Sequence, residues 1–117
     1  MLINVTAATE IFVFHDPVNF NMGFAGMIGF CRRILDLEPM NGAYFLFRSK
    51  LGQQIRVLTY DGDGWWLATK KFSHGSVRYW PKTLEAMSQI EAREFLLLLL
   101  RGDLQGARLP ELWKKIG

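Results

Sequence analysis

Two histidines, one cysteine and a closely spaced pair of aspartates are the side chains of this sequence that could carry out chemistry. His15, His74 and Cys31 are far apart along the chain, and neither histidine has a cysteine or a second histidine nearby. A zinc site is typically built from closely spaced Cys and His ligands, so we predict none here. Cys31 falls on the apolar side of a predicted helix, where cysteine usually serves as a small buried hydrophobic residue. A nucleophilic pair of Cys31 and His15 is therefore not favoured.

The segment Asp61-Gly-Asp-Gly64 could bind a hard cation through its carboxylates. It lacks the further ligands and the bidentate glutamate of a calcium loop, whereas Asp and Gly are well suited to the backbone angles of a tight turn. We therefore predict a hairpin turn and no metal or other cofactor. No phosphate-binding glycine loop, nucleophile elbow or acid–base pair is recognisable. An enzyme that uses Cys31, Asp61 or Asp63 is the least favoured alternative, and we predict no catalytic residues.

Positive charge is concentrated in the middle of the chain. The 117 residues carry a formal net charge of +3, but Gly42 to Lys82 holds seven cationic residues against Asp61 and Asp63, a net charge of +5. Cations among aromatic rings favour a nucleic acid, since phosphates attract the charge and unpaired bases stack on rings. The predicted nucleic-acid-binding residues are Arg48, Lys50, Arg56, Tyr60, Lys70, Lys71, Arg78 and Trp80. The alternative, which stays open, is that the rings form the core and the charges only solvate the surface.

The same middle segment has the pattern of a four-stranded antiparallel β-meander. Four runs rich in strand-forming residues, 43–48, 54–60, 65–72 and 76–80, are separated by short turns. Connections this short join antiparallel neighbours. A further strand is predicted over 10–15, and the sequence leaves its place in the sheet open.

Helices are predicted on both sides of the meander. Asn19 is a suitable N-cap for a helix that runs to about Leu37, and Ser88-Gln-Ile-Glu91 is a capping box for a helix over 89–101. Apolar residues from Leu109 to Ile116 recur at helical spacing and predict a short last helix. The chain is thus predicted to be one α+β domain over residues 1–117.

The run Phe95 to Leu100 is apolar around the whole helix, so a single buried face does not account for it. It lies either in the centre of the core or against a partner, which would be a second copy or another protein. The predicted partner interface is Phe95, Leu97, Leu98, Leu100 and Trp113.

Cysteine content and hydropathy favour the cytoplasm. A single cysteine forms no intramolecular disulfide, and the N-terminus has no basic segment before an apolar run. The longest apolar run is far shorter than the roughly 20 residues that cross a bilayer, so no membrane partner is expected.

A series of short motifs follows a fixed order through the chain. They are Tyr44-Phe-Leu-Phe-Arg48, Gln54-Ile-Arg-Val-Leu58, Tyr60-Asp-Gly-Asp-Gly64, Lys70-Lys71-Phe72, Gly75 and Tyr79-Trp-Pro81. In this order the chain resembles the small accessory protein encoded beside the transposase of the insertion-sequence-sixty-six family. That protein is often called TnpB, a label it shares with an unrelated RNA-guided nuclease. The resemblance covers about residues 10–108, with Leu97 to Ala107 similar to the family's leucine-rich helix end.

The resemblance implies a non-catalytic accessory role in moving a bacterial mobile element, beside a separate transposase that cleaves DNA. Its expected partners are the DNA ends of the element, which the basic meander would bind, and the transposase. The alternative is a protein-interaction module that docks the transposase or self-associates through the leucine-rich helix without touching DNA.

The chain also departs from the family's pattern before its first helix. Asn19 replaces an acidic residue, Asn21 and Met22 replace Arg and Lys, and Ala25 replaces a second Asp. The usual basic tail is reduced to Glu111-Leu-Trp-Lys-Lys115. These departures weaken any charge-based role of the two segments and leave the basic meander as the predicted DNA-binding element.

Overall fold

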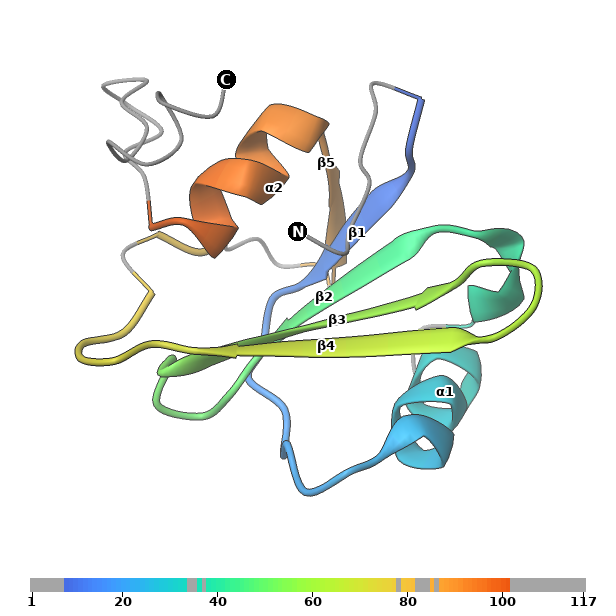
Figure 1. The fold of residues 1–117 in the computed structure, drawn as a ribbon, viewed down its shortest axis with the longest axis horizontal. Coiled ribbons are helices and arrows are strands. Elements are labelled where there is room, and N and C mark those ends of the chain that lie inside the picture. The colour runs from blue at the N-terminus through green and yellow to red at the C-terminus, as the bar shows by residue number, and fades with distance from the viewer. Residues whose placement is uncertain are drawn as a thin grey trace.

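A five-stranded sheet of mixed direction forms the centre of the molecule (Figure 1). The computed structural model describes residues 8–33, 36, 38–77, 79–81, 85 and 87–101. The strands lie in the order β4-β3-β2-β1-β5, with β1 parallel to β2 and all other neighbours antiparallel. Their bounds are β1 Ile11–Phe14, β2 Tyr44–Arg48, β3 Gln54–Tyr60, β4 Trp65–Lys71 and β5 Met87–Ile90.

One helix covers each face of the sheet. Helix α1, Phe24–Arg33, lies on one side and helix α2, Ala92–Leu99, on the other, and a short 3-10 helix η1, Pro39–Asn41, precedes β2 (Figure 1). Successive side chains of each strand point to opposite faces of the sheet, so they contribute to two separate cores. Leu46 and Val57 belong to the core that contains Phe95 of α2, whereas Phe45 and Leu58 belong to the core that contains Met27 of α1. We call these two sides the α2 face and the α1 face.

The α+β class and three strands of the predicted meander, β2, β3 and β4, are confirmed. The predicted turn between β3 and β4 is also confirmed. The Asp61 carboxylate oxygen Oδ1 accepts hydrogen bonds from the backbone amides of Asp63, at 2.8 Å, and Gly64, at 2.7 Å. Gly62 adopts a φ of 96°, which glycine tolerates without a Cβ penalty.

The predicted fourth meander strand over 76–80 is wrong. Residues 76, 77, 79 and 80 lie outside any strand. After β4 the chain turns back across the end of the sheet instead of pairing with its edge, and the Val77 amide donates to the carbonyl of Gly52 at 2.8 Å. The Trp80 indole then donates to the carbonyl of Phe14 at 2.9 Å, which anchors the segment beside β1.

A strand also replaces the predicted start of the second helix. Met87–Ile90 forms β5, antiparallel to β1, and α2 begins only at Ala92. The Ser88 hydroxyl lies 2.8 Å from Nε2 of His15 and does not cap the helix, and Ile90 is buried in the sheet core. Burial of Ile90 and the contact with His15 therefore outweigh the capping-box pattern.

Both observed helices start later than predicted. Asn19 closes a local turn, in which its Oδ1 accepts the amide of Asn21 at 2.9 Å, and α1 starts five residues later, at Phe24. Helix α2 ends at Leu99. The predicted last helix, which includes Trp113, lies outside the described residues. None of the helices in the described part of the chain is long and apolar enough to cross a membrane.

Candidate functional site

The predicted nucleic-acid-binding cations lie on both faces of the sheet, not on one. Arg48 and Lys70 both pair with Ile55, a core residue of the α2 face, so they share that face. Arg56 and Lys71 occupy the alternate positions and share the α1 face. Arg78 lies outside the described residues. The expected common patch on one face is therefore corrected to two groups of cations.

Arg48 and Trp80 hold the end of β1 in place. The Arg48 guanidinium donates to the carbonyl of His15 through Nε at 3.2 Å and Nη2 at 2.9 Å. It also lies 5.9 Å from the centre of the Trp80 ring. Trp80 is only 6% exposed and its indole is bonded to Phe14. The prediction that Trp80 stacks on a base is thus corrected, since the ring packs in the core.

Arg56 links the sheet to the segment that leads into α1. Its Nε donates to the Thr69 hydroxyl at 2.9 Å, and its Nη1 donates to the carbonyls of Phe20 and Met22 at 2.9 and 3.0 Å. The guanidinium carbon lies 4.3 Å from the centre of the Phe20 ring. Burial lowers the pKa of Arg56 from its ordinary value. Arg56 therefore orders this loop while it keeps its charge.

Tyr60 lies at the opposite end of the hairpin. Its ring packs against Trp65, with the centroids 4.9 Å apart, and its hydroxyl donates to the carbonyl of Gly62 at 3.3 Å. The residue is half-buried. The ring thus lies beside the acidic β3–β4 turn and not beside the cations.

Cations from several elements meet where β4 ends. The Lys70 ammonium donates to the carbonyl of Leu99 at 2.7 Å and lies 5.4 Å from the centre of the Phe72 ring. The Arg101 guanidinium lies 4.3 Å from the same ring and donates to the carbonyl of His74 at 2.8 Å. Burial, together with the charge of Arg101, lowers the pKa of Lys70. We call the cations around this end of the strand the basic end of β4; they are Lys70 and Arg101 on the α2 face, Arg56 and Lys71 on the α1 face, and Lys50 in the β2–β3 turn.

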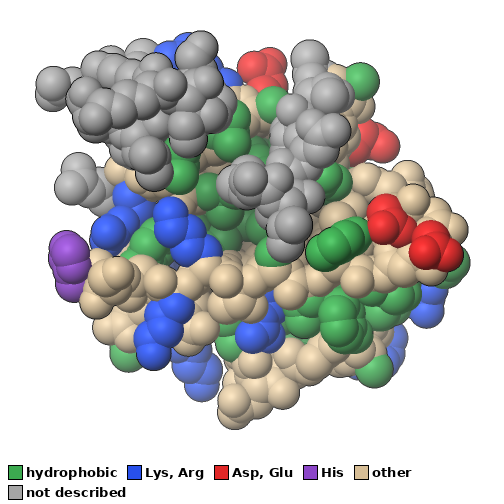
Figure 2. Space-filling view, viewed as in Figure 1, with side chains coloured by type: hydrophobic (Ala, Val, Ile, Leu, Met, Phe, Trp, Pro, Cys, Tyr) green, Lys and Arg blue, Asp and Glu red, His purple; other side chains and the backbone are tan. Residues whose placement is uncertain are grey.

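The charge of this cluster is not neutralised by the described carboxylates. The only salt bridge within the described ranges joins Arg32 and Glu38 at 2.8 Å. The hydrogen bonds of Arg56, Lys70 and Arg101 end on carbonyl and hydroxyl oxygens, which carry no net charge. Figure 2 shows most of the visible Lys and Arg side chains on the left half of this side, with acidic side chains on the right and at the top. An approaching anion would therefore meet uncompensated positive charge.

Sequence reasoning missed Arg101. It lies 30 residues or more from the other members and follows the apolar run of α2. Its place beside Lys70 results from the return of α2 over the sheet, which brings both side chains to Phe72. No local pattern in the sequence signals this contact.

The predicted partner interface on α2 is largely inside the molecule. Phe95, Leu97 and Leu98 are buried, and Leu100 is half-buried. Phe95 also packs edge-on against Tyr44, with ring centroids 6.0 Å apart. Trp113 lies outside the described residues. The prediction that these buried side chains dock a partner is therefore corrected, because they pack within the chain.

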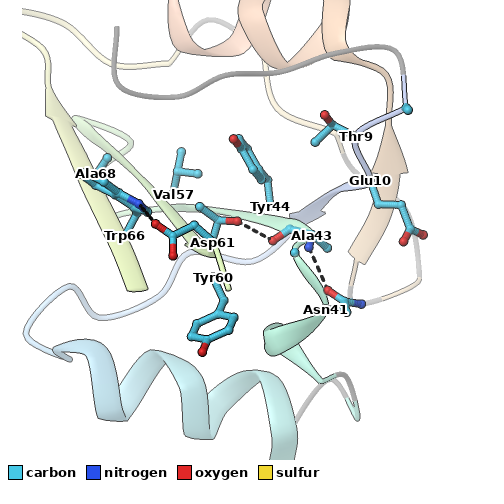
Figure 3. A pocket seen from close by; sticks show the side chains of 13 residues that line it. Thr9, Glu10, Asn41, Ala43, Tyr44, Val57, Tyr60, Asp61, Trp66 and Ala68 are labelled. Atoms are coloured by element: carbon cyan, nitrogen blue, oxygen red, sulfur yellow. Dashed lines mark hydrogen bonds between the residues drawn. The ribbon is translucent and has the colours of Figure 1, made fainter. Parts of the chain in front are cut away.

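A cavity of about 520 Å³ opens on the α2 face, near the β3–β4 turn. Figure 3 shows Tyr44, Val57 and Trp66 around it, with Glu10 and Asp61 among the lining residues. Trp66 is 45% exposed and its Nε1 donates to the Asp61 carboxylate at 2.8 Å. Hydrogen bonds to Asp61 lower the pKa of that carboxyl. Two carboxylates beside apolar side chains suit an apolar or cationic group and repel phosphate.

Cys31 and His15, two of the residues that could carry out chemistry, are both buried. Cys31 is buried, and burial raises the pKa of its thiol to about 12. His15 is buried too, with Nδ1 2.6 Å from the carbonyl of Glu85. Within the part of the chain that the structure describes, no cluster of three or more His, Cys, Asp or Glu side chains could hold a metal ion.

Comparisons with known proteins agree with the resemblance seen in the sequence. Residues 9–108 match the family model described as IS66 Orf2 like protein. The chain is 29% identical to the uncharacterized protein y4jC of Sinorhizobium fredii over 98 residues, which are 84% of this chain and 83% of that protein. It is also 34% identical to the uncharacterized protein y4hO of the same organism over 59 residues, half of each chain. No solved structure matches.

Proposed function

Because the chain belongs to the IS66 Orf2-like family, we propose that it is a non-catalytic accessory protein of bacterial transposition that binds DNA through the basic end of β4. The family membership supports the transposition role. The DNA contact is supported by one structural observation: the five cations of the basic end have no described carboxylate within salt-bridge distance. The element's own terminal DNA is the expected ligand, and the transposase supplies strand cleavage.

The geometry favours contact with phosphates over contact with bases. Lys50 and Lys71 are exposed and free to reach a phosphate, whereas Arg56, Lys70 and Arg101 are held in place by carbonyl or hydroxyl acceptors. Trp80 is buried and Tyr60 lies beside the acidic β3–β4 turn, so neither ring is placed to stack on a base bound at the cations. A surface of this kind binds duplex DNA with little direct reading of sequence, since phosphate contacts position a protein without specifying bases.

The salt dependence of binding tests this mode. If about four phosphates are neutralised, log affinity falls with log salt at a slope of about −3 to −4 on duplex DNA. Fluorescence anisotropy with a labelled duplex from the element's ends measures this slope. No binding at low salt, or a slope near zero, would contradict the proposal.

A matched pair of variants locates the contact. The double variant Lys50→Gln, Lys71→Gln removes two exposed cations of the basic end. We expect the slope of log affinity against log salt to become less negative by about 2. Arg33→Gln with Arg93→Gln removes the same charge from exposed positions on α1 and α2. The control should bind nearly as well as the wild type. Equal losses in both variants would mean that only net charge matters and that the basic end is not the site.

The second candidate is a protein-interaction module that docks the transposase without touching DNA. The cavity beside Trp66 favours it, because a ring that is 45% exposed, next to Asp61, suits a cationic side chain of a partner. A pull-down with the cognate transposase, using the wild type and Trp66→Ala, tests this candidate. Two results together would favour this candidate over DNA binding. The wild type would bind the transposase but not DNA, and the Trp66→Ala variant would no longer bind the transposase.

A further inference from the structure

Strand β4 is an open edge of the sheet. Within the described residues it has one neighbour, β3, and it pairs with that strand without interruption from Trp65 to Lys71. It contains no proline and no bulge, and none of its residues is fully buried. Natural proteins usually protect such edges, because their free amide and carbonyl groups pair with another strand. Here two lysines at one end are the main protection.

The hydrogen-bond pattern shows which backbone groups are free. The Asp61 amide donates to Gly64 at one end of the hairpin, and the Phe72 amide donates to Gln53 at the other. Hydrogen-bonded and non-hydrogen-bonded pairs alternate between these two points. Trp66, Ala68 and Lys70 therefore bond to β3. The residues whose amide and carbonyl groups point away from β3 are Trp65, Leu67, Thr69 and Lys71.

Charge is distributed unevenly along this edge. Lys70 and Lys71 lie at its end, and the turn at its start carries Asp61 and Asp63. A second copy of β4 that pairs antiparallel places each basic end beside the acidic turn of the other copy. Parallel pairing would place like charges together, which is unfavourable. The edge is thus complementary to itself in one direction only.

We propose that two copies of this chain associate by antiparallel pairing of β4 with β4, centred on Ala68. In this register Trp65 of one copy faces Lys71 of the other, and Leu67 faces Thr69. The amide and carbonyl groups that point away from β3 in one copy can therefore hydrogen-bond to those of the other. Lys70 faces Trp66 of the other copy on the α2 face. The Asp61 carboxylate already holds that indole in place. The result is one ten-stranded sheet with two basic ends.

The self-complementary charge favours a second copy over a different protein as the occupant, because one strand supplies both halves of every contact. The proposal is independent of DNA binding. Lysine side chains project from the faces of the sheet, whereas the pairing uses backbone groups in its plane. Sedimentation velocity without DNA therefore measures the pairing alone. If no dimer is found, the DNA binding measured by anisotropy is unaffected.

A proline at the edge tests the backbone contact. Thr69→Pro removes an amide that points away from β3, and Thr69→Val is its control, since both lose the hydroxyl that accepts from Arg56. We expect the wild type and Thr69→Val to sediment as dimers and Thr69→Pro as a folded monomer. A wild type that stays monomeric at all concentrations, or a Thr69→Pro variant as dimeric as Thr69→Val, would overturn the proposal.

A charge exchange tests the direction of pairing without changing the backbone. Lys71→Glu and Asp63→Lys each replace attraction by repulsion at two symmetry-related contacts, and each should weaken the dimer by about tenfold. The double variant restores opposite charges and should return to within about threefold of the wild type. If the double variant is as weak as, or weaker than, the single variants, antiparallel pairing in this register is wrong.

Discussion

The Lys70 ammonium lies 2.7 Å from the carbonyl oxygen of Leu99, so a cation on the edge of the sheet caps the C-terminus of α2. The last carbonyls of a helix have no partner within the helix and carry partial negative charge, which a cation stabilises. Lys70 therefore joins the candidate DNA-binding surface to the helix packed over the α2 face. A residue predicted from the sequence as a ligand for phosphate also stabilises the fold.

Replacement of Lys70 should lower the free energy of unfolding. Lys70→Met keeps the aliphatic stem and removes the charged donor, and we expect a loss of about 1 kcal/mol. Urea unfolding followed by fluorescence measures this loss. Lys71→Met is the matched control, because Lys71 is the neighbouring exposed lysine, and it should stay within about 0.5 kcal/mol of the wild type. Equal losses in both variants would mean that the contact with Leu99 contributes nothing.

Arg56→Lys should destabilise the protein although the charge is kept. Lysine cannot reproduce the simultaneous contacts of the guanidinium with Thr69 and with the carbonyls of Phe20 and Met22. We expect a loss of about 1 to 2 kcal/mol in the free energy of unfolding. Faster hydrogen exchange at residues 20–24 would place the effect in the loop before α1. Unchanged exchange in that loop would contradict the role assigned to Arg56.

The Asp61 turn should weaken in acid. Its hydrogen bonds favour the charged carboxylate and lower its pKa in the folded protein from the ordinary value of 3.8. The unfolded state therefore takes up the proton first, and the contribution of Asp61 to stability is lost as the pH falls from about 3.8 through the folded pKa. Unfolding curves of the wild type should show this decline. Asp61→Asn, which does not titrate, should show a smaller one over the same pH range.

Cys31 should react slowly with thiol reagents in the folded protein. Its thiol is buried and its pKa is raised to about 12, so almost no thiolate is present at pH 8. Ellman's reagent should modify Cys31 in the folded protein far more slowly than a small free thiol, and at a normal rate in denaturant. Fast modification of the folded protein would show that the core around Met27 and Cys31 opens readily.

Local patterns in the sequence were sufficient for three of the four predicted meander strands. The alternation of apolar and polar residues and the Asp-Gly-Asp-Gly turn predicted β2, β3 and β4, because strands joined by tight turns depend on neighbours in the chain. The burial of Cys31 followed from helical spacing in the same way. Motif order also carried the family assignment, since it depends only on residue identity.

Contacts between distant segments decided the rest. The local pattern of Ser88 to Glu91 predicts a helix start, but residues 87–90 pair with β1 and form β5. Ser88 also contacts His15, which is 73 residues away in the sequence. Trp80 reads as a surface ring beside Arg78, yet its indole is bonded to Phe14 in the core. In both cases a pairing partner remote in sequence offered more buried contact than the local pattern.

Sequence alone determined which residues carry the positive charge, because charge is a property of composition. Only the tertiary structure decided where that charge is available. It placed Arg48 and Arg56 on opposite faces, brought Arg101 beside Lys70, and left β4 without a second described neighbour. The physical reason is that the direction of a side chain follows from the register of its strand and the course of the chain around the sheet, and both are set by packing over the whole domain.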